Sequence, residues 1–293
     1  LGHVHRHRNR PDAPVQQGTL PSAHAFPDIP VHLRDIPGLL DQGNEPSRGH
    51  KALFSPVPPD QGLTAYDPPV IDIALGLDEK YEFVLADSGL EMFKGTILVD
   101  SHMKTNLSDV YAAGDCAMVK NAITEKPQWS AMGSTANIAG RALALNLGGS
   151  ETEYPGCLGT GVVKLSQEMN AARTGMTQVQ AQAAGFNVAS VLCVADDKAH
   201  YYPDSDIFVT KLVADAASHR VLGIQVIGGG AVDKMADIAV AGISLGARVD
   251  DFIMMDFAYA PPFSTAIHPF AAACGILANK MSGRLCSFTP AEY

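Results

Sequence analysis

The segment from Thr105 to Asp115, TNLSDVYAAGD, contains residue types that could bind a nucleotide-like cofactor. We predict a strand of small residues over 109–113 that ends at Gly114 and Asp115. Glycine lets a bulky ligand approach the end of a strand, and a carboxylate accepts hydrogen bonds from ribityl or ribose hydroxyls. An ordinary strand, turn and helix with Asp115 as N-cap explains these residues equally well.

A helix predicted from Ser130 to Leu147 follows this segment. It contains many small residues, including Ala131, Gly133 and Ser134, so that a ligand could approach its backbone closely. The N-terminus of a helix presents free amides and a partial positive charge, which suit an electron-rich ring oxygen.

Gly228–Gly230, between an apolar strand and a helix, offers a second candidate nucleotide site. However, Asp233 occupies the third small position of the dinucleotide fingerprint. The preceding strand is also predicted to pair in a hairpin rather than by a parallel crossover. We therefore interpret the glycines as an ordinary strand-to-helix turn.

The cysteines and histidines suggest few reactive groups. Five widely spaced cysteines without a C-x-x-C pair are typical of reduced thiols in a cytosolic protein. Cys116 could be a reactive thiol or a small buried residue, and His268, at a predicted helix start, could act in acid-base chemistry or as a cap. The alternating histidines of residues 3–7 fit a basic tail better than a metal site, so we predict no bound metal.

Composition limits the class of protein. The 293 residues are 46% hydrophobic and 18% charged, which is typical of a globular chain of two domains. A net charge of −10 disfavours binding to nucleic acid or to anionic membranes. The sequence has no apolar run of membrane-spanning length and no signal peptide at its start, which indicates a cytoplasmic protein.

The chain divides into four parts that differ in composition and in expected secondary structure. Residues 1–69 hold 12 of the 19 prolines and 6 of the 10 histidines, and are predicted to be irregular. We predict one unit over 70–150, a second over 151–286, and a tail over 287–293. The expected strands are 70–75, 95–100, 109–113, 161–165, 188–194, 207–214 and 221–227, and the further expected helices are 177–185, 231–246 and 268–281.

Four motifs carry a resemblance to a known family. Thr105–Asp115 resembles the second flavin-binding motif, T-x-x-x-x-V-Y-A-x-G-D, of FAD-dependent pyridine nucleotide-disulfide oxidoreductases, and Met132–Arg141 resembles the helix that follows it. Tyr201-Tyr202-Pro203 and Tyr259–Ser264, YAPPFS, are similar to the dimerisation domain of the coenzyme A-disulfide reductase and NADH oxidase branch. The resemblance implies an α/β plus α+β fold: a partial FAD-binding domain followed by a C-terminal dimerisation domain.

The resemblance also implies site residues. FAD would be contacted by Gly114, Asp115, Thr135 and Ala136. In a homodimer, Tyr259 and either Tyr201 or Tyr202 would reach the partner's site as catalytic residues, their hydroxyls donating to a thiolate or a substrate sulfur. The alternative is that these tyrosines only pack the dimer interface.

The implied activity is transfer of electrons from NAD(P)H through FAD to a disulfide, another small sulfur substrate or oxygen. The family's G-x-G-x-x-G loop, its redox cysteine and its NADH domain are not visible in the sequence. The alternative function is therefore a non-catalytic dimerisation module, and whether the chain is an enzyme is left open.

Overall fold

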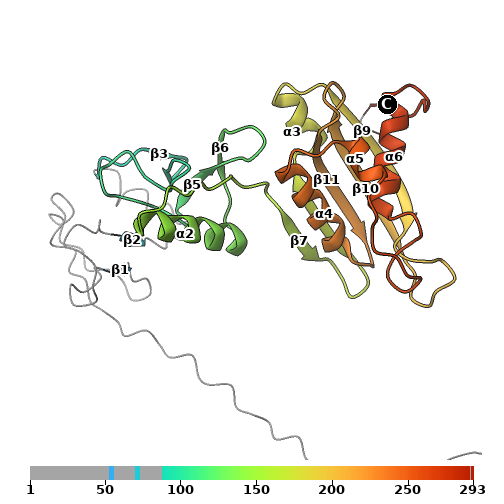
Figure 1. Ribbon diagram of the computed structural model, residues 1–293, viewed down its shortest axis with the longest axis horizontal. Coiled ribbons are helices and arrows are strands. Elements are labelled where there is room, and N and C mark those ends of the chain that lie inside the picture. The colour runs from blue at the N-terminus through green and yellow to red at the C-terminus, as the bar shows by residue number, and fades with distance from the viewer. Residues whose placement is uncertain (1–52, 56–69, 73–87, 291) are drawn as a thin grey trace, which may run out of the picture.

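The computed structural model describes residues 53–55, 70–72, 88–290 and 292–293 (Figure 1). Two short strands, β1 (Leu53–Ser55) and β2 (Val70–Asp72), pair antiparallel. The rest of the irregular segment predicted over 1–69, and the end of the strand predicted over 70–75, lie outside the described residues. Among the helices that are described, none has the length and apolar character needed to cross a membrane.

The first unit is a four-stranded sheet that carries one helix. Its strands are β3 (Met92–Phe93), β4 (Thr96–Leu98), β5 (Ala117–Lys120) and β6 (Pro127–Trp129), and the central pair, β4 and β5, is parallel. The helix is α2 (Gly133–Leu147), which confirms the predicted helix to within a few residues. The small residues Ala139 and Ala142 face inward on α2 and pack against Met103 and Val119, so that the helix lies close to the sheet.

The strand predicted over 109–113 is wrong. Asp109 has a left-handed φ of 62° and turns the chain, so that the next residues run back against the preceding ones. The amide of Thr105 donates to the carbonyl of Val110, and the amide of Ala112 donates to the carbonyl of Met103. This narrow loop contains a single β-bridge, Lys104 to Tyr111, and delivers the chain to β5, which the sequence prediction missed.

The second unit is a five-stranded antiparallel sheet in the order β7-β8-β11-β10-β9. The predicted hairpin between the last two strands in the sequence is confirmed, because Phe208 to Ala214 pair with Val221 to Gly228. β8 was not predicted. The bounds are β7 (Gly161–Lys164), β8 (Asn170–Gly175), β9 (Val188–Asp196), β10 (Ile207–Asp215) and β11 (Val221–Gly228).

Helices cover one face of this sheet. α4 (Val232–Ser244) packs on β8 and β11, and α6 (Pro269–Met281) packs on β9 and β10, close to both predicted ranges. α3 (Gln178–Ala183) begins at the predicted Thr177, whose hydroxyl accepts from the Gln180 amide in a capping box. α5 (Val249–Ile253) was not predicted; its Phe252 ring packs edge-on against Phe270 at 4.9 Å.

The two units have separate hydrophobic cores. Tyr154 and Cys157 belong to the core under α2, whereas Leu158 belongs to the core between the five-stranded sheet and its helices. The connection is short, and Ala122 and Ile123 of the first unit pack against the second core. Figure 1 shows the two sheets side by side along the long axis.

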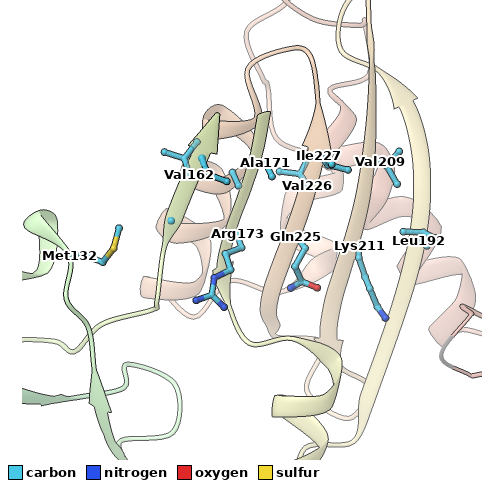
Figure 2. Close-up of a pocket in the computed structure, with 13 residues that line it drawn as sticks. Met132, Val162, Ala171, Arg173, Leu192, Val209, Lys211, Gln225, Val226 and Ile227 are labelled. Atoms are coloured by element: carbon cyan, nitrogen blue, oxygen red, sulfur yellow. The ribbon is translucent and has the colours of Figure 1, made fainter. Parts of the chain in front are cut away.

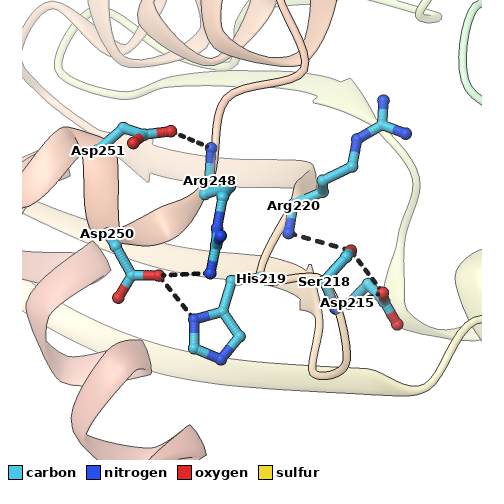
Figure 3. A network of polar contacts seen from close by, with 7 residues as sticks. All are labelled: Asp215, Ser218, His219, Arg220, Arg248, Asp250 and Asp251. Atoms are coloured by element: carbon cyan, nitrogen blue, oxygen red, sulfur yellow. Dashed lines mark hydrogen bonds and ion pairs between the residues drawn. The ribbon is translucent and has the colours of Figure 1, made fainter.

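A polar network closes the hairpin tip that connects β10 and β11 (Figure 3). His219 Nδ1 lies 2.6 Å from Asp250 Oδ2, and Arg248 Nη2 lies 3.6 Å from the same oxygen. Asp215 accepts hydrogen bonds from the hydroxyl and the amide of Ser218, which hold the pKa of its carboxyl below the ordinary value. These contacts pin the tip of the hairpin to the start of α5.

We expect Asp250→Asn to lower the free energy of unfolding by at most about 1 kcal/mol, because Asp250 and its ion-pair partner Arg248 are both largely exposed. Urea unfolding in low and high salt would measure the loss, which should shrink with added salt. Asp237→Asn, at an exposed α4 position, is the matched control. A loss several times larger, or one that salt does not change, would contradict this assignment.

Candidate functional site

The turn before β5 leaves open space around Gly114. Gly114 has a φ of +86°, and a Cβ built there would meet nothing within 4 Å. The side chain of Asp115 is exposed, while its backbone carbonyl accepts a hydrogen bond from Trp129 Nε1 at 2.9 Å. The turn is therefore held by its backbone, and the carboxylate of Asp115 is left accessible.

Cys116 does not share this exposure. Its side chain is buried, and Sγ donates to the carbonyl of Ala113 at 3.4 Å. The geometry fits the small buried residue that the sequence analysis considered, rather than a thiol presented to a ligand.

The N-terminus of α2 offers unused hydrogen-bond donors. Its N-cap, Met132, provides no side-chain cap, and the first turn has no acidic residue. Within the described part of the chain, nothing accepts a hydrogen bond from the amides of Gly133, Ser134 or Thr135. The amide of Ala136 already donates to the Met132 carbonyl at 2.9 Å. Three free amides with the positive end of the helix dipole suit an electron-rich oxygen.

A buried polar cluster beneath the start of α2 engages the Thr135 side chain in hydrogen bonds. Thr135 Oγ1 lies 2.8 Å from Ser130 Oγ and also hydrogen-bonds Tyr154. Burial raises the pKa of Tyr154 to about 12, with the neighbouring Cys157 adding to the shift. Burial also raises the pKa of Cys157. Tyr154 and Cys157 are therefore neutral at pH 7. Because the Thr135 hydroxyl is already bonded within this cluster, Thr135 can offer a ligand its amide but not its hydroxyl.

The first unit fits the flavin ring better than it fits the phosphates of FAD. Besides Gly114, the exposed Gly133 and the partly buried Gly140 of α2 have open space where a Cβ would stand, so a flat ring could approach them. By contrast, the sequence contains no G-x-G-x-x-G loop to hold a pyrophosphate. No group of three metal-ligating side chains occurs among the described residues.

The two tyrosine segments lie together in the second unit. The amide of Ala199, just before Tyr201 and Tyr202, donates to the carbonyl of Pro261, two residues after Tyr259. The exposed fractions of the tyrosines are 69% for Tyr201, 39% for Tyr202 and 51% for Tyr259. The three hydroxyls have no hydrogen-bond partner among the described residues, so they remain available as donors.

These loops do not meet the flavin-motif residues within one chain. The connection between β9 and β10 lies at the far end of the second unit, away from α2 (Figure 1). Gly114 and Asp115 lie in the first unit, and a second copy of the chain would be needed to bring the two sets together.

The turn at Gly228–Gly230 is packed against carboxylates. A Cβ on Gly229 would overlap the Asp206 carboxylate, and a Cβ on Gly230 would lie 2.5 Å from Asp197 Oδ2. Glycines are needed here so that the turn can pass these side chains. The ordinary-turn interpretation fits this geometry.

No motif in the sequence indicated the open face of the five-stranded sheet. A shallow cavity of about 590 Å³ lies on this face, and Figure 2 shows its apolar lining from Val162, Ala171 and Val209. The side chains of Arg173, Gln225 and Lys211 point to one end of it. Val163, Leu192 and Val194 are also exposed, and an apolar surface this continuous is typical of a protein interface.

Two family models match the chain. Residues 166–271 match the dimerisation domain of pyridine nucleotide-disulphide oxidoreductases, and residues 64–137 match the model described as pyridine nucleotide-disulphide oxidoreductase. Both lie where the sequence motifs indicated. They confirm the predicted fold class, with a reductase unit followed by a dimerisation unit.

Individual relatives extend the comparison. The chain is 34% identical over 183 residues to an NAD(P)H sulfur oxidoreductase (CoA-dependent) of Pyrococcus furiosus, covering 62% of this chain and 41% of the relative. It is 26% identical to an NADH oxidase of Methanocaldococcus jannaschii, covering 75% and 48% of the two chains. Its fold is similar to an NAD-dependent persulfide reductase from A. fulgidus, with a TM-score of 0.67, 32% identity, and coverage of 70% and 38%. The chain thus spans about two fifths of the length of the first of these relatives.

Proposed function

Because the chain belongs to the pyridine nucleotide-disulphide oxidoreductases, we propose that it forms the flavin-contacting and dimerising part of an enzyme that reduces small sulfur compounds. Electrons would pass from NAD(P)H through FAD to a disulfide or persulfide, with oxygen as the alternative acceptor. The observation that carries this proposal is the uncapped start of α2, which follows Trp129, together with the open turn at Gly114 and Asp115, whose carbonyl accepts from the Trp129 indole. Residues 70–150 would form the flavin unit, and residues 151–286 would form the unit that pairs two chains.

In this proposal the chain holds the flavin ring through its backbone. FAD, when bound, supplies the chemistry of two-electron transfer. The free amides of Gly133, Ser134 and Thr135 would donate to a ring oxygen, and the Asp115 carboxylate would accept from a ribityl hydroxyl. Ala136 would contribute a small side chain, since its amide is already used within the helix.

The tyrosines would serve the sulfur acceptor across a homodimer. Tyr259 and Tyr201 or Tyr202 sit on adjoining loops with free hydroxyls, which supports a role as donors to a thiolate or a substrate sulfur. The greater exposure of Tyr201 leaves more of its ring available to a partner chain than that of Tyr202.

A second function is favoured by one sequence observation. Residues 1–115 contain neither a cysteine nor a G-x-G, so the described flavin contacts lack both a phosphate anchor and a redox thiol. A non-catalytic dimerisation module that binds flavin weakly or not at all would need neither.

Binding of FAD to the purified chain tests the proposal. We expect added FAD to bind, and we expect Asp115→Asn to weaken FAD binding about tenfold through loss of a charge-assisted hydrogen bond. Bleaching of the bound FAD by added NADH then shows whether the chain also provides a site for the electron donor. Flavin fluorescence would measure both affinities. Asp109→Asn, an exposed carboxylate in the loop before the same turn, is the control and should leave affinity unchanged.

Three outcomes separate the two functions. Binding together with bleaching supports the enzyme. If FAD binds but NADH does not bleach it, and if Asp115→Asn loses affinity while Asp109→Asn does not, the flavin contacts are supported but a site for the electron donor is not. Failure to bind any FAD would overturn the flavin role and leave the dimerisation module.

A further inference from the structure

A small polar cavity lies in the second unit, between the starts of α4 and α6. Its volume is about 170 Å³, and its lining includes Lys198, Lys234, Ser264 and His268. Roughly 10–15 Å³ of such space is enough for one water molecule, so this cavity has room for a polyatomic ion. It is separate from the turn at Gly114 and from the apolar sheet face.

Ser264 provides a buried hydroxyl that no described residue pairs with. Ser264 is 1% exposed, and its Oγ makes no hydrogen bond to any residue that the structure describes. An unpaired buried polar atom costs free energy, and native proteins rarely leave one unexplained. A ligand in the cavity that accepts a hydrogen bond would explain this one.

His268 supplies a second donor. Its Nδ1 accepts a hydrogen bond from the Phe270 amide at 3.2 Å, which makes Nε2–H the donor of the neutral ring. The ring is 5% exposed and packs against Phe257 at 4.7 Å, so its orientation is fixed. Burial, together with the nearby Lys234, lowers the pKa of His268 to about 4, and the ring is neutral at pH 7.

The charges around the cavity favour an anion. Asp197 is the one carboxylate in the lining, and both of its oxygens are engaged: Oδ1 accepts from the Asp206 amide at 2.8 Å, and Oδ2 lies 3.5 Å from Lys198 Nζ. Lys234 has no ion-pair partner among the described residues. α4 and α6 both begin at the cavity wall, and α4 lacks a side-chain cap. The positive end of the α4 dipole therefore adds to the ammonium charge, and Asp233 in the first turn of α4 offsets part of it.

We propose that this cavity binds a small oxyanion of the phosphate or sulfate type. Ser264 Oγ–H, His268 Nε2–H and the Lys234 ammonium would donate to its oxygens. The proposal does not depend on flavin binding. The cavity wall at Ser264 continues the segment of Tyr259, and the wall at Lys198 continues the segment of Tyr201, so a bound anion would tie together the two loops that carry the tyrosines.

Anion binding to the full chain tests this inference. We expect inorganic phosphate and sulfate, but not chloride at matched ionic strength, to raise the melting temperature and to give heat in titration calorimetry. Methyl phosphate separates the two sources of such a group: binding of inorganic phosphate alone indicates a free ion, and binding of both indicates the end of a larger ligand.

Two variants locate the site. Ser264→Ala should unfold like the parent in chloride, because the hydroxyl has no partner to lose, yet it should bind phosphate at least about tenfold more weakly. Lys234→Gln should weaken binding by a similar factor, and Lys211→Gln, on the opposite sheet face, should have no effect. Absence of phosphate and sulfate binding, or equal weakening in all three variants, would overturn the proposal.

Discussion

Gly175→Ala is expected to destabilise the protein by at least about 4 kcal/mol. Gly175 ends β8 with a φ of +70°, where an alanine costs roughly 1–2 kcal/mol in backbone strain. An added Cβ would also overlap the Leu222 carbonyl oxygen and lie 2.8 Å from Gly223 Cα. Both atoms belong to the backbone of the neighbouring strand, so relief requires β8 and β11 to separate in the middle of the sheet.

Gly185→Ala is the matched control for this substitution. Gly185 follows α3 with a φ of +92°, but a Cβ there would meet nothing within 4 Å, so only the backbone strain of roughly 1–2 kcal/mol applies. Urea unfolding of both variants, followed by circular dichroism, measures the difference. Equal losses in the two variants would show that the close approach of β8 and β11 does not exist.

The sequence predicted the elements whose residues carry a strong periodic pattern. α4 shows inward-facing Met235, Ala239 and Ile243 at helical spacing, and its prediction is confirmed to within a few residues. β10 and β11 combine β-branched residues with a polar turn, and they form the predicted hairpin.

β8 shows why the rest of the fold escaped prediction. Its sequence, Asn170 to Gly175, contains polar and small residues with low strand propensity. It is a strand because β7 and β11 pair with it on both sides, and Thr174 and Ala172 are buried there. The pairing with β11 joins residues far apart in the sequence, such as Asn170 and Gly228, which no local pattern reports.

The candidate site likewise contains some groups that a local sequence pattern indicates and others that only the fold brings together. Gly114 and Asp115 belong to a local motif, so the sequence alone was enough to predict them as candidates. The free amides of Gly133 and Ser134 are backbone groups, visible only once the start of α2 is fixed at Met132. The cavity at Ser264 joins loops and helix starts that lie far apart in sequence, so its donors could not be grouped from spacing.

His268 is expected to make the stability of the protein fall as the pH is lowered. The folded-state pKa is about 4, below the ordinary value of 6.5, because burial and the nearby Lys234 disfavour the charged ring. Below pH 6.5 the unfolded chain therefore binds a proton that the folded chain refuses. This contribution to stability is complete above pH 6.5 and is lost as the pH falls toward 4, to a limit of about 3 kcal/mol.

His268→Asn isolates this effect from every other titrating group. Asparagine is a good N-cap, so its side-chain oxygen can still accept from the Phe270 amide while the titrating ring is removed. Asp197, Lys198 and Lys234, which also line the cavity, remain in both proteins and cancel in the comparison. Urea unfolding in chloride buffer at pH 7, 5.5 and about 4.5 should show a steeper loss for the parent than for the variant. Parallel losses would mean that the buried ring does not resist protonation, and the cavity would then present a cation rather than the neutral donor that the proposed oxyanion site uses.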